Sequence, residues 1–291
     1  MTRQIKVGNV LIGGGAPVAI QSMLNTKTTD VEGSLAQIRA LKTAGCQIAR
    51  LSVQNMEAAR GFAEICKQSE LPLVADIHFD YKLAIASIEH GADKIRINPG
   101  NIGDEDRVRQ VVMACRERHI PIRIGVNSGS LEKEFYEKYG SSPKAMVESA
   151  KYHASILEEC GMENIVISLK ASDVRKTVEA YELMAKECNY PLHLGVTEAG
   201  TERSSLVKSS IGIGSLLLKG IGDTVRVSIT DSPVKEIYAA RDILNAVNLR
   251  VETPRIVACP TCGRTKIDLV SLANQVEEAV KNIKKPVKIA V

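Results

Sequence analysis

The chain alternates short apolar segments with longer stretches of helical periodicity, and it does so eight times. Between the apolar segments, stretches such as 31–45, 104–119 and 174–189 carry apolar residues at helical spacing. The apolar segments are rich in Val, Ile and Leu, as buried strands are, and they read VAIQSM from residue 18, IARLSV from 48, LVADIH from 73, KIRINP from 94, IRIGVN from 122, IVISLK from 165, LHLGVT from 192 and VRVSIT from 225. Eight strand–helix units predict an α/β protein built as a (β/α)8 TIM barrel.

The chain length and a proline-containing break indicate where the barrel ends. About 250 residues is the usual size of this fold, and the Pro-containing segment NLRVETPR, from residue 248, marks a break. We therefore expect a barrel domain over 1–252 and the beginning of a small α+β domain over 253–291. A polar insertion between the fifth and sixth strands, at 128–145, is a candidate lid on the catalytic face. Glycines suited to helix C-caps precede several strands, at positions 45, 91, 161 and 222.

Composition excludes several classes of protein. A chain with 44% hydrophobic and 25% charged residues is typical of a soluble globular protein. It contains no run of about 18 apolar residues, and its start is too polar for a signal peptide, so we expect no membrane association and a cytoplasmic location. With 3% aromatic residues, no Trp and a net charge of +4, nucleic acid is a poor candidate partner. The seven cysteines are too scattered for a disulfide framework.

The strand alternation sends charged side chains into the barrel. Successive side chains of a strand point to opposite faces, so Ile95 and Ile97 would face the helices. The residues expected to point inward are Lys94, Arg96, Asn98, Arg123, Asn127, Arg226, Ser228, Thr230, Asp76, His78, Ser168 and Lys170. Most barrels fill this space with branched apolar residues, and an unpaired buried cation costs several kcal/mol.

These cations point to an anionic ligand. With Arg50 they come from five different strands, whereas the strand-end acids are Asp76 and Glu198. Phosphate or diphosphate is the natural partner, since guanidinium groups bind its oxygens bidentately. The alternative is that each cation pairs with a nearby acid or is solvated at the rim. His78 alone would more often be a core histidine, and Glu198 could be an acid–base group or a counter-charge.

Cys259 and Cys262 form a Cys-x-x-Cys pair with no further Cys or His after them. A zinc or iron–sulfur site needs about four donors, so either the pair is not a metal site or the other ligands are absent from this chain. A thiol pair before a helix could also perform disulfide exchange. A zinc ribbon would need a second Cys pair, which the segment lacks.

Six motifs, in their order along the whole chain, closely resemble one family. They are IGGGAPVAIQSM, ADIHFD, KIRINPGN, IRIGVNSGS, LGVTEAG and CPTCGR. The chain is identified by them as a member of the 4-hydroxy-3-methylbut-2-en-1-yl diphosphate synthase (IspG/GcpE) family. The resemblance implies a barrel that binds 2-C-methyl-D-erythritol 2,4-cyclodiphosphate and a C-terminal domain with a 4Fe–4S cluster. It also implies reductive ring opening to (E)-4-hydroxy-3-methylbut-2-enyl diphosphate in the non-mevalonate (MEP) isoprenoid pathway.

The resemblance also implies roles for individual residues. The diphosphate would be held by Arg50, Arg96, Arg123, Lys170, Arg226 and Ser228. Asn127, Thr197 and Glu198 would face the methylerythritol part, with Glu198 the candidate catalytic group. The substrate-binding set is completed by Asp76, His78 and Asn98.

Cys259 and Cys262 match two of the three Cys ligands of the family's cluster. The third Cys and a ligating Glu lie in a Cys-containing Asn-Gly-Pro-Gly-Glu segment just beyond a strand resembling KKPVKIAV, where this sequence stops. We therefore expect an apparently truncated chain that binds substrate but holds the cluster poorly. The family also implies a flavodoxin or ferredoxin electron donor and a homodimer. Without the resemblance, the alternative is a non-redox barrel enzyme or binding protein for a phosphorylated or pterin-like ligand.

Overall fold

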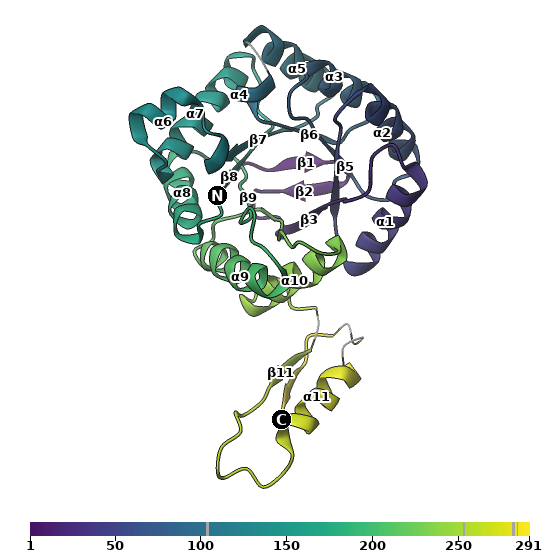
Figure 1. The fold of residues 1–291 in the computed structure, drawn as a ribbon, viewed down its shortest axis with the longest axis vertical. Helices are drawn as coiled ribbons and strands as arrows, with labels where there is room; N and C mark the ends of the chain where they lie inside the picture. The colour runs from purple at the N-terminus through teal and green to yellow at the C-terminus, as the bar shows by residue number, and fades with distance from the viewer. Residues whose placement is uncertain (103–104, 253, 281–282, 284) are drawn as a thin grey trace. The chain divides into compact units, whose positions relative to one another are not determined.

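The computed structural model divides into two units, Met1–Ala240 and Arg241–Val291. It describes residues 1–102, 105–252, 254–280, 283 and 285–291. The first unit is a barrel of parallel strands surrounded by helices (Figure 1). The second is a small parallel strand pair with one helix of its own.

Eight parallel strands form the wall of the barrel, in the order β8-β7-β6-β5-β4-β3-β10-β9. An isolated parallel bridge between Ile167 and Leu192 joins β8 to the segment that leads into β9, and so completes the ring. The predicted TIM barrel is confirmed. The strands are β3 (Ala19–Met23), β4 (Ile48–Ser52), β5 (Leu73–Asp76), β6 (Lys94–Ile97), β7 (Ile122–Asn127), β8 (Ile165–Lys170), β9 (His193–Leu194) and β10 (Thr224–Val225).

The outer helices begin and end at the signals expected from the sequence. Asp30, Asn55 and Asp173 each accept a backbone hydrogen bond as the N-cap of the helix that follows. Gly45 closes the first helix with φ of 107°, a left-handed conformation that glycine adopts without strain. The barrel helices are α1 (Val31–Ala44), α2 (Met56–Gln68), α3 (Tyr81–Glu89), α4 (Pro99–Ile102), α5 (Glu105–Glu117), α6 (Lys133–Tyr139), α7 (Pro143–Glu159), α8 (Val174–Glu187), α9 (Glu202–Leu218) and α10 (Pro233–Ala246), the last of which continues into the second unit.

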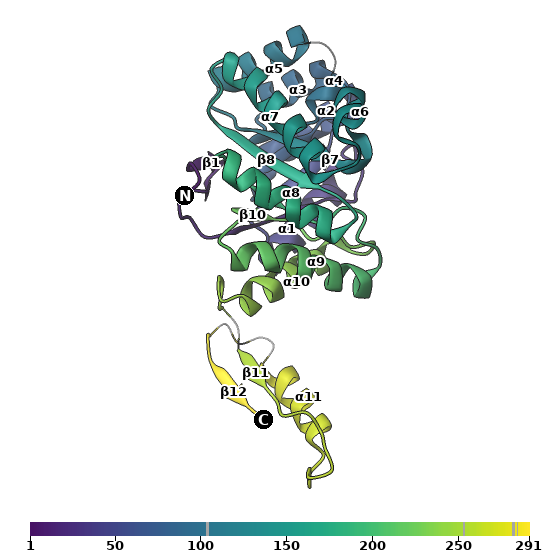
Figure 2. The ribbon, with the colours of Figure 1, turned by 90° about the vertical axis from the view of Figure 1, so that its left-hand side faces the viewer.

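An N-terminal hairpin closes one end of the barrel. The sequence analysis did not predict it. Strands β1 (Ile5–Val7) and β2 (Val10–Ile12) pair antiparallel. Their apolar side chains join those of four barrel strands in one buried cluster, made of Ile5, Val7, Ile12, Ala19, Ile48, Val74 and Val166. Figure 2 shows β1 at one end of the barrel and α6 toward the other. The open end is therefore the carboxyl end of the strands, where catalytic residues of this fold lie.

The last two barrel strands are shorter than the six residues predicted for each. The ladder continues as far as the backbone N–H of Arg226, which donates to the carbonyl of Leu194 at 3.0 Å. Beyond it, the N–H of Ile229 donates to a carboxylate of Glu236 and that of Thr230 to the carbonyl of Gly200. Regular pairing stops because these other acceptors take the backbone donors. Thr230, predicted to point inward, is exposed.

The polar insertion at 128–145 is mostly helical and is tethered to the barrel. It contains a 3-10 turn at Ser128–Ser130 and helix α6. Glu132, just before α6, accepts hydrogen bonds from Ser149 Oγ and His153 Nε2 of α7, both at 2.7 Å. Burial opposes the charge of Glu132, but these two hydrogen bonds lower its pKa. The segment follows β7 at the open end of the barrel, and its role as a lid stays a prediction.

The second unit contains β11 (Arg255–Val257), α11 (Leu269–Val280) and β12 (Lys288–Ala290). The two strands pair in parallel, with Ile256 opposite Ile289. The loop between β11 and α11 carries Cys259 and Cys262. Over the described ranges of the whole chain, no helix combines the length and apolar character needed to span a membrane.

Candidate active site: the cation-lined barrel mouth

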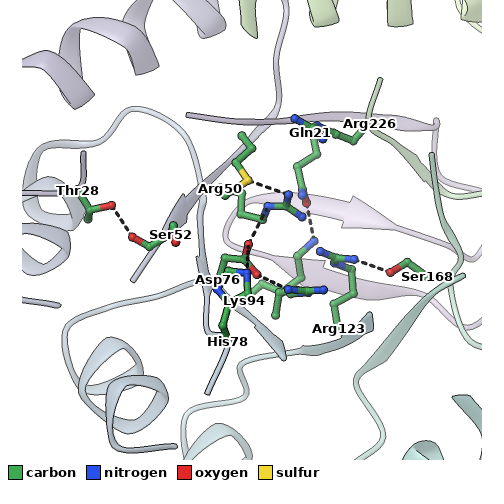
Figure 3. Close-up of polar contacts among 12 residues, drawn as sticks. Gln21, Thr28, Arg50, Ser52, Asp76, His78, Lys94, Arg123, Ser168 and Arg226 are labelled. Atoms are coloured by element: carbon green, nitrogen blue, oxygen red, sulfur yellow. Dashed lines mark hydrogen bonds and ion pairs between the residues drawn. The ribbon is translucent and has the colours of Figure 1, made fainter. Parts of the chain in front are cut away.

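Asp76, at the end of β5, is surrounded by cationic side chains from the neighbouring strands. Arg96 donates from Nη1 to Asp76 Oδ1 at 3.0 Å, and Arg50 Nε lies 3.7 Å from Oδ2 (Figure 3). His78 Nε2 lies 3.9 Å from the same Oδ2. Burial alone would raise the pKa of Asp76, but Arg50, Arg96 and Arg123 lower it to about 2. The carboxylate is therefore ionised at neutral pH and holds two arginines in place.

Arg123 has one edge of its guanidinium without a partner. Its side chain is 2% exposed, and Nη1 donates to Ser168 Oγ at 2.5 Å. Nε and Nη2 have no hydrogen-bond partner within the described part of the chain. Burial and the charges of Arg50 and Arg96 hold the pKa of Arg123 well below its usual value. A buried cation with two free donors side by side on one edge suits two oxygens of a phosphate group.

A polar layer lies below these arginines. Lys94 is fully buried and donates from Nζ to Gln21 Oε1 at 3.0 Å. Burial, together with the nearby arginine charges, holds its pKa well below the usual value. His193, also fully buried, places Nδ1 2.7 Å from Thr224 Oγ1, while its Nε2 has no partner among the described residues. Burial lowers the pKa of His193 strongly, so its ring is neutral. The sequence analysis placed Lys94 in the lumen but did not single out Gln21 or His193.

Two glycines of the barrel wall make room for the long cations. A Cβ at Gly125 would lie 2.7 Å from Nε of Arg96, and one at Gly195 would lie 2.7 Å from Nζ of Lys170. A side chain at Gly125 would displace the Arg96 guanidinium, and one at Gly195 would clash with both Lys170 Nζ and the backbone oxygen of Arg226. Lys170, at the end of β8, is buried, and this burial together with the charge of Arg123 holds its pKa well below the usual value.

Glu236 is a buried carboxylate of the site that the sequence analysis missed. It lies in the first turn of α10 and is 3% exposed. Arg226 donates to it from Nε at 3.2 Å and from Nη2 at 2.8 Å. No sequence pattern singles it out, because a glutamate at the start of an outer helix normally faces solvent. The two buried acids of the site are thus Asp76 and Glu236, since Glu198 is exposed.

The other predicted residues follow the strand ends at the mouth. Asn98 is buried, and its Oδ1 has no partner among the described residues. Asn127, Thr197 and Ser228 are half-buried. Glu198 has φ of 51°, an uncommon left-handed conformation for a residue other than glycine. Such strain is concentrated at functional sites.

Cys259 and Cys262 belong to the second unit and are exposed. The backbone N–H of Cys262 donates to Thr265 Oγ1 at 3.1 Å. Hydrogen bonds from the backbone and side chain of Arg264 lower the pKa of Cys262, which favours the thiolate that binds metals. Across the described ranges, however, no three His, Cys, Asp or Glu side chains come together in a group that could hold a metal ion. The described donors therefore do not complete a four-ligand cluster site.

Fold and site together define a (β/α)8 barrel whose open end carries an excess of cationic side chains. Among the described residues, Arg50, Arg96, Arg123, Lys170 and Arg226 stand there with two buried carboxylates, Asp76 and Glu236. The chain belongs to the GcpE family, because the family model described as the GcpE TIM-barrel domain matches residues 2–241. A second model, the GcpE protein C-terminal domain, matches residues 255–291.

Curated relatives match over the full length of this chain. A protein of Caldanaerobacter subterraneus is 56% identical over 292 residues, which cover 100% of this chain and 82% of the relative. A protein of Brevibacillus brevis is 56% identical, with 100% and 81% covered, and one of Fusobacterium nucleatum 55%, with 100% and 82% covered. All three are named 4-hydroxy-3-methylbut-2-en-1-yl diphosphate synthase (flavodoxin).

Solved structures of low sequence identity share the fold. Dihydropteroate synthase of Yersinia pestis aligns with a TM-score of 0.59 at 12% identity, over 85% of this chain and 99% of that one. A sialic acid synthetase of Leptospira borgpetersenii aligns with a TM-score of 0.58 at 13% identity, over 97% and 99%. At these identities the likeness supports the barrel and nothing about the ligand.

Proposed function

We propose that this chain binds 2-C-methyl-D-erythritol 2,4-cyclodiphosphate at the barrel mouth and serves its reductive ring opening to (E)-4-hydroxy-3-methylbut-2-enyl diphosphate. This is the step of the MEP isoprenoid pathway for which its relatives are named. The observation that carries the proposal is the unpartnered, buried Nε/Nη2 edge of Arg123 within an excess of cations. A cyclic diphosphate supplies the oxygens and the negative charge that this arrangement lacks. The non-redox alternative has no such support from the relatives.

In the proposed complex, Arg123 contacts the diphosphate directly, while Asp76 orients Arg50 and Arg96 toward it. Binding here stabilises the cations, because each of them lost water on folding. Asn127, Thr197 and Glu198 then face the carbon skeleton from the rim. Ring opening consumes two electrons and two protons and releases one water. Glu198 is the exposed carboxylate at this position and is the proposed proton donor or acceptor.

The two electrons would come from a 4Fe–4S cluster with Cys259 and Cys262 among its ligands. We propose flavodoxin as the electron donor, because the relatives carry that word in their names. We further propose a homodimer, a functional boundary after residue 252 and a cytoplasmic location. All seven cysteines are free thiols, which is usual in a reducing compartment. The boundary lies in the segment between the two family matches, which end at 241 and begin at 255.

Replacing Arg123 with Met tests the proposed function. The change removes both free donors but keeps an apolar stem, so the affinity for the cyclodiphosphate should fall by about 1.5–3 kcal/mol, the range for charged hydrogen bonds. Titration calorimetry on the 291-residue chain measures this. Arg175→Met, at an exposed position of α8, is the matched control and should bind as the parent does. Equal affinity in the Arg123 variant and the parent would refute the role of Arg123.

Iron retention tests the cluster assignment. Because no group of three possible metal ligands comes together among the described residues, the 291-residue chain, reconstituted anaerobically with iron and sulfide, should lose most of its iron on desalting. The full-length Caldanaerobacter relative, treated alongside, should keep its iron and a broad absorption near about 400 nm, as thiolate-bound clusters do. A full complement of four irons on the short chain would show that other side chains, or a second copy, supply the missing ligands.

A further inference from the structure

Glu236 makes an unusually complete set of hydrogen bonds for a carboxylate outside the predicted site. Its Oε1 accepts from Arg226 Nη2 at 2.8 Å and from the backbone N–H of Ile229 at 3.2 Å. Its Oε2 accepts from Arg226 Nε at 3.2 Å and from Ser22 Oγ at 2.7 Å. These donors belong to β3 and to the segment after β10, so one carboxylate joins the first and last strands of the barrel to α10.

We propose that Glu236 is a positioning residue, which fixes the Nε/Nη2 edge of Arg226 so that the Nη1/Nη2 end of its guanidinium is left to contact the diphosphate. The inference rests on the proposed function and deepens it. The bidentate pair occupies Nε and Nη2, and no bond from Nη1 is found within the described part of the chain. Figure 3 draws Arg226 together with Arg50, Lys94 and Arg123.

Arg226 and Arg123 therefore present different edges of their guanidinium groups to the ligand. Arg123 donates from Nη1 to Ser168 and keeps its Nε/Nη2 edge free, whereas Arg226 uses that edge to bind Glu236. The pair of parallel donors left to Arg226 is the one at its Nη1/Nη2 end. A guanidinium locked in this way loses little freedom when the ligand arrives, which is how preorganisation raises affinity.

Glu236 also offsets the repulsion between positive charges that would otherwise move the Arg226 side chain. Arg50 lies close enough to Arg226 for the two positive charges to disfavour each other, and this repulsion contributes, after burial, to a lowered pKa of about 10 for Arg50. With Glu236 neutral, Arg226 would be free to swing toward solvent, since its side chain is 19% exposed. The carboxylate keeps the cation at the mouth.

A double-mutant cycle separates positioning from a general structural role. Glu236→Gln, Arg226→Met and the double variant are titrated with the cyclodiphosphate as 291-residue chains. Glu236→Gln should weaken binding about tenfold, and Arg226→Met at least as much. In the Arg226→Met background, Glu236→Gln should cause no further loss, because the effect acts through Arg226. An additive loss, or unchanged affinity in Glu236→Gln, would overturn the inference.

Two further variants keep the test decisive if Glu236→Gln folds poorly. Arg226→Lys leaves Glu236 intact but offers it a single ammonium, which the carboxylate should hold away from the ligand, so this variant should bind as weakly as Arg226→Met. Affinity like that of the parent would refute the proposal. Glu202→Gln, an exposed partner of Lys235, is the control and should bind normally. If the parent itself does not bind the cyclodiphosphate, the proposed function fails, and the same cycle is then measured with inorganic pyrophosphate.

Discussion

Replacing Asp76 with Asn is expected to lower the free energy of unfolding of the barrel by about 3–5 kcal/mol, the cost of breaking a buried ion pair from one side. Asp76 is 2% exposed and holds Arg96 at 3.0 Å. An amide of the same shape removes the carboxylate charge that lies between Arg50 and Arg96. Chemical denaturation of the chain at neutral pH measures the change. Asp231→Asn, at an exposed position paired with Lys235, should change stability little.

The pH dependence gives a second check on Asp76. Its folded-state pKa of about 2 lies below the ordinary value of 3.8. The unfolded chain therefore binds the proton more readily, so the stabilisation is complete above 3.8 and is lost as the pH falls through about 2. The gap in stability between the parent and Asp76→Asn should narrow over this window. A gap that stays constant down to the lower limit would contradict the assigned ionisation.

Glu198→Gln should lower turnover by about 10²–10⁴-fold while leaving substrate affinity nearly unchanged, the range for loss of a general acid or base. The measurement needs the proposed cluster, so the variant is made in a version lengthened by the Cys-containing Asn-Gly-Pro-Gly-Glu segment that the family resemblance implies. Calorimetry on the same variant reports affinity. Loss of affinity with turnover retained at saturation would make Glu198 a binding group instead.

Glu202→Gln serves as the control for turnover, since Glu202 is an exposed residue in the first turn of α9. It should turn over substrate as the parent does. The left-handed backbone of Glu198 adds a further expectation. Glu198→Gly should relieve strain and raise stability slightly, yet it should turn over substrate as poorly as Glu198→Gln. A stable and fully active glycine variant would remove the carboxylate from the chemistry.

The central strands could be predicted from the sequence because they are buried on both faces and follow a strict alternation. IRIGVN and IVISLK became β7 and β8 residue for residue. The N-terminal hairpin could not, because three-residue strands carry too little pattern to separate from a loop. The length of β10 was overestimated, because VRVSIT alternates like a strand although its later N–H groups bond to Glu236 and Gly200.

The cationic lumen followed from alternation alone, since the side-chain period of a strand fixes which residues share a face. Lys94, Arg96 and Arg123 all point inward as predicted and are buried. What the sequence could not show was how each cation is partnered. Arg226 pairs with Glu236, ten positions away and on a different element, and no local pattern links them. Roles at the site thus depend on tertiary contacts even where the residues themselves were identified.

The hairpin formed by β1 and β2 covers the amino-terminal end of a barrel whose interior is already filled by side chains. Ile5, Val7 and Ile12 fill its lower end, and among the described residues they are buried together with side chains of the barrel strands. Substrate and product must then use the same opening at the strand ends. In the proposed function both carry a diphosphate, so both would compete for the free edge of Arg123. The product must therefore leave before the next substrate can bind, and the rate of product release sets an upper limit on turnover.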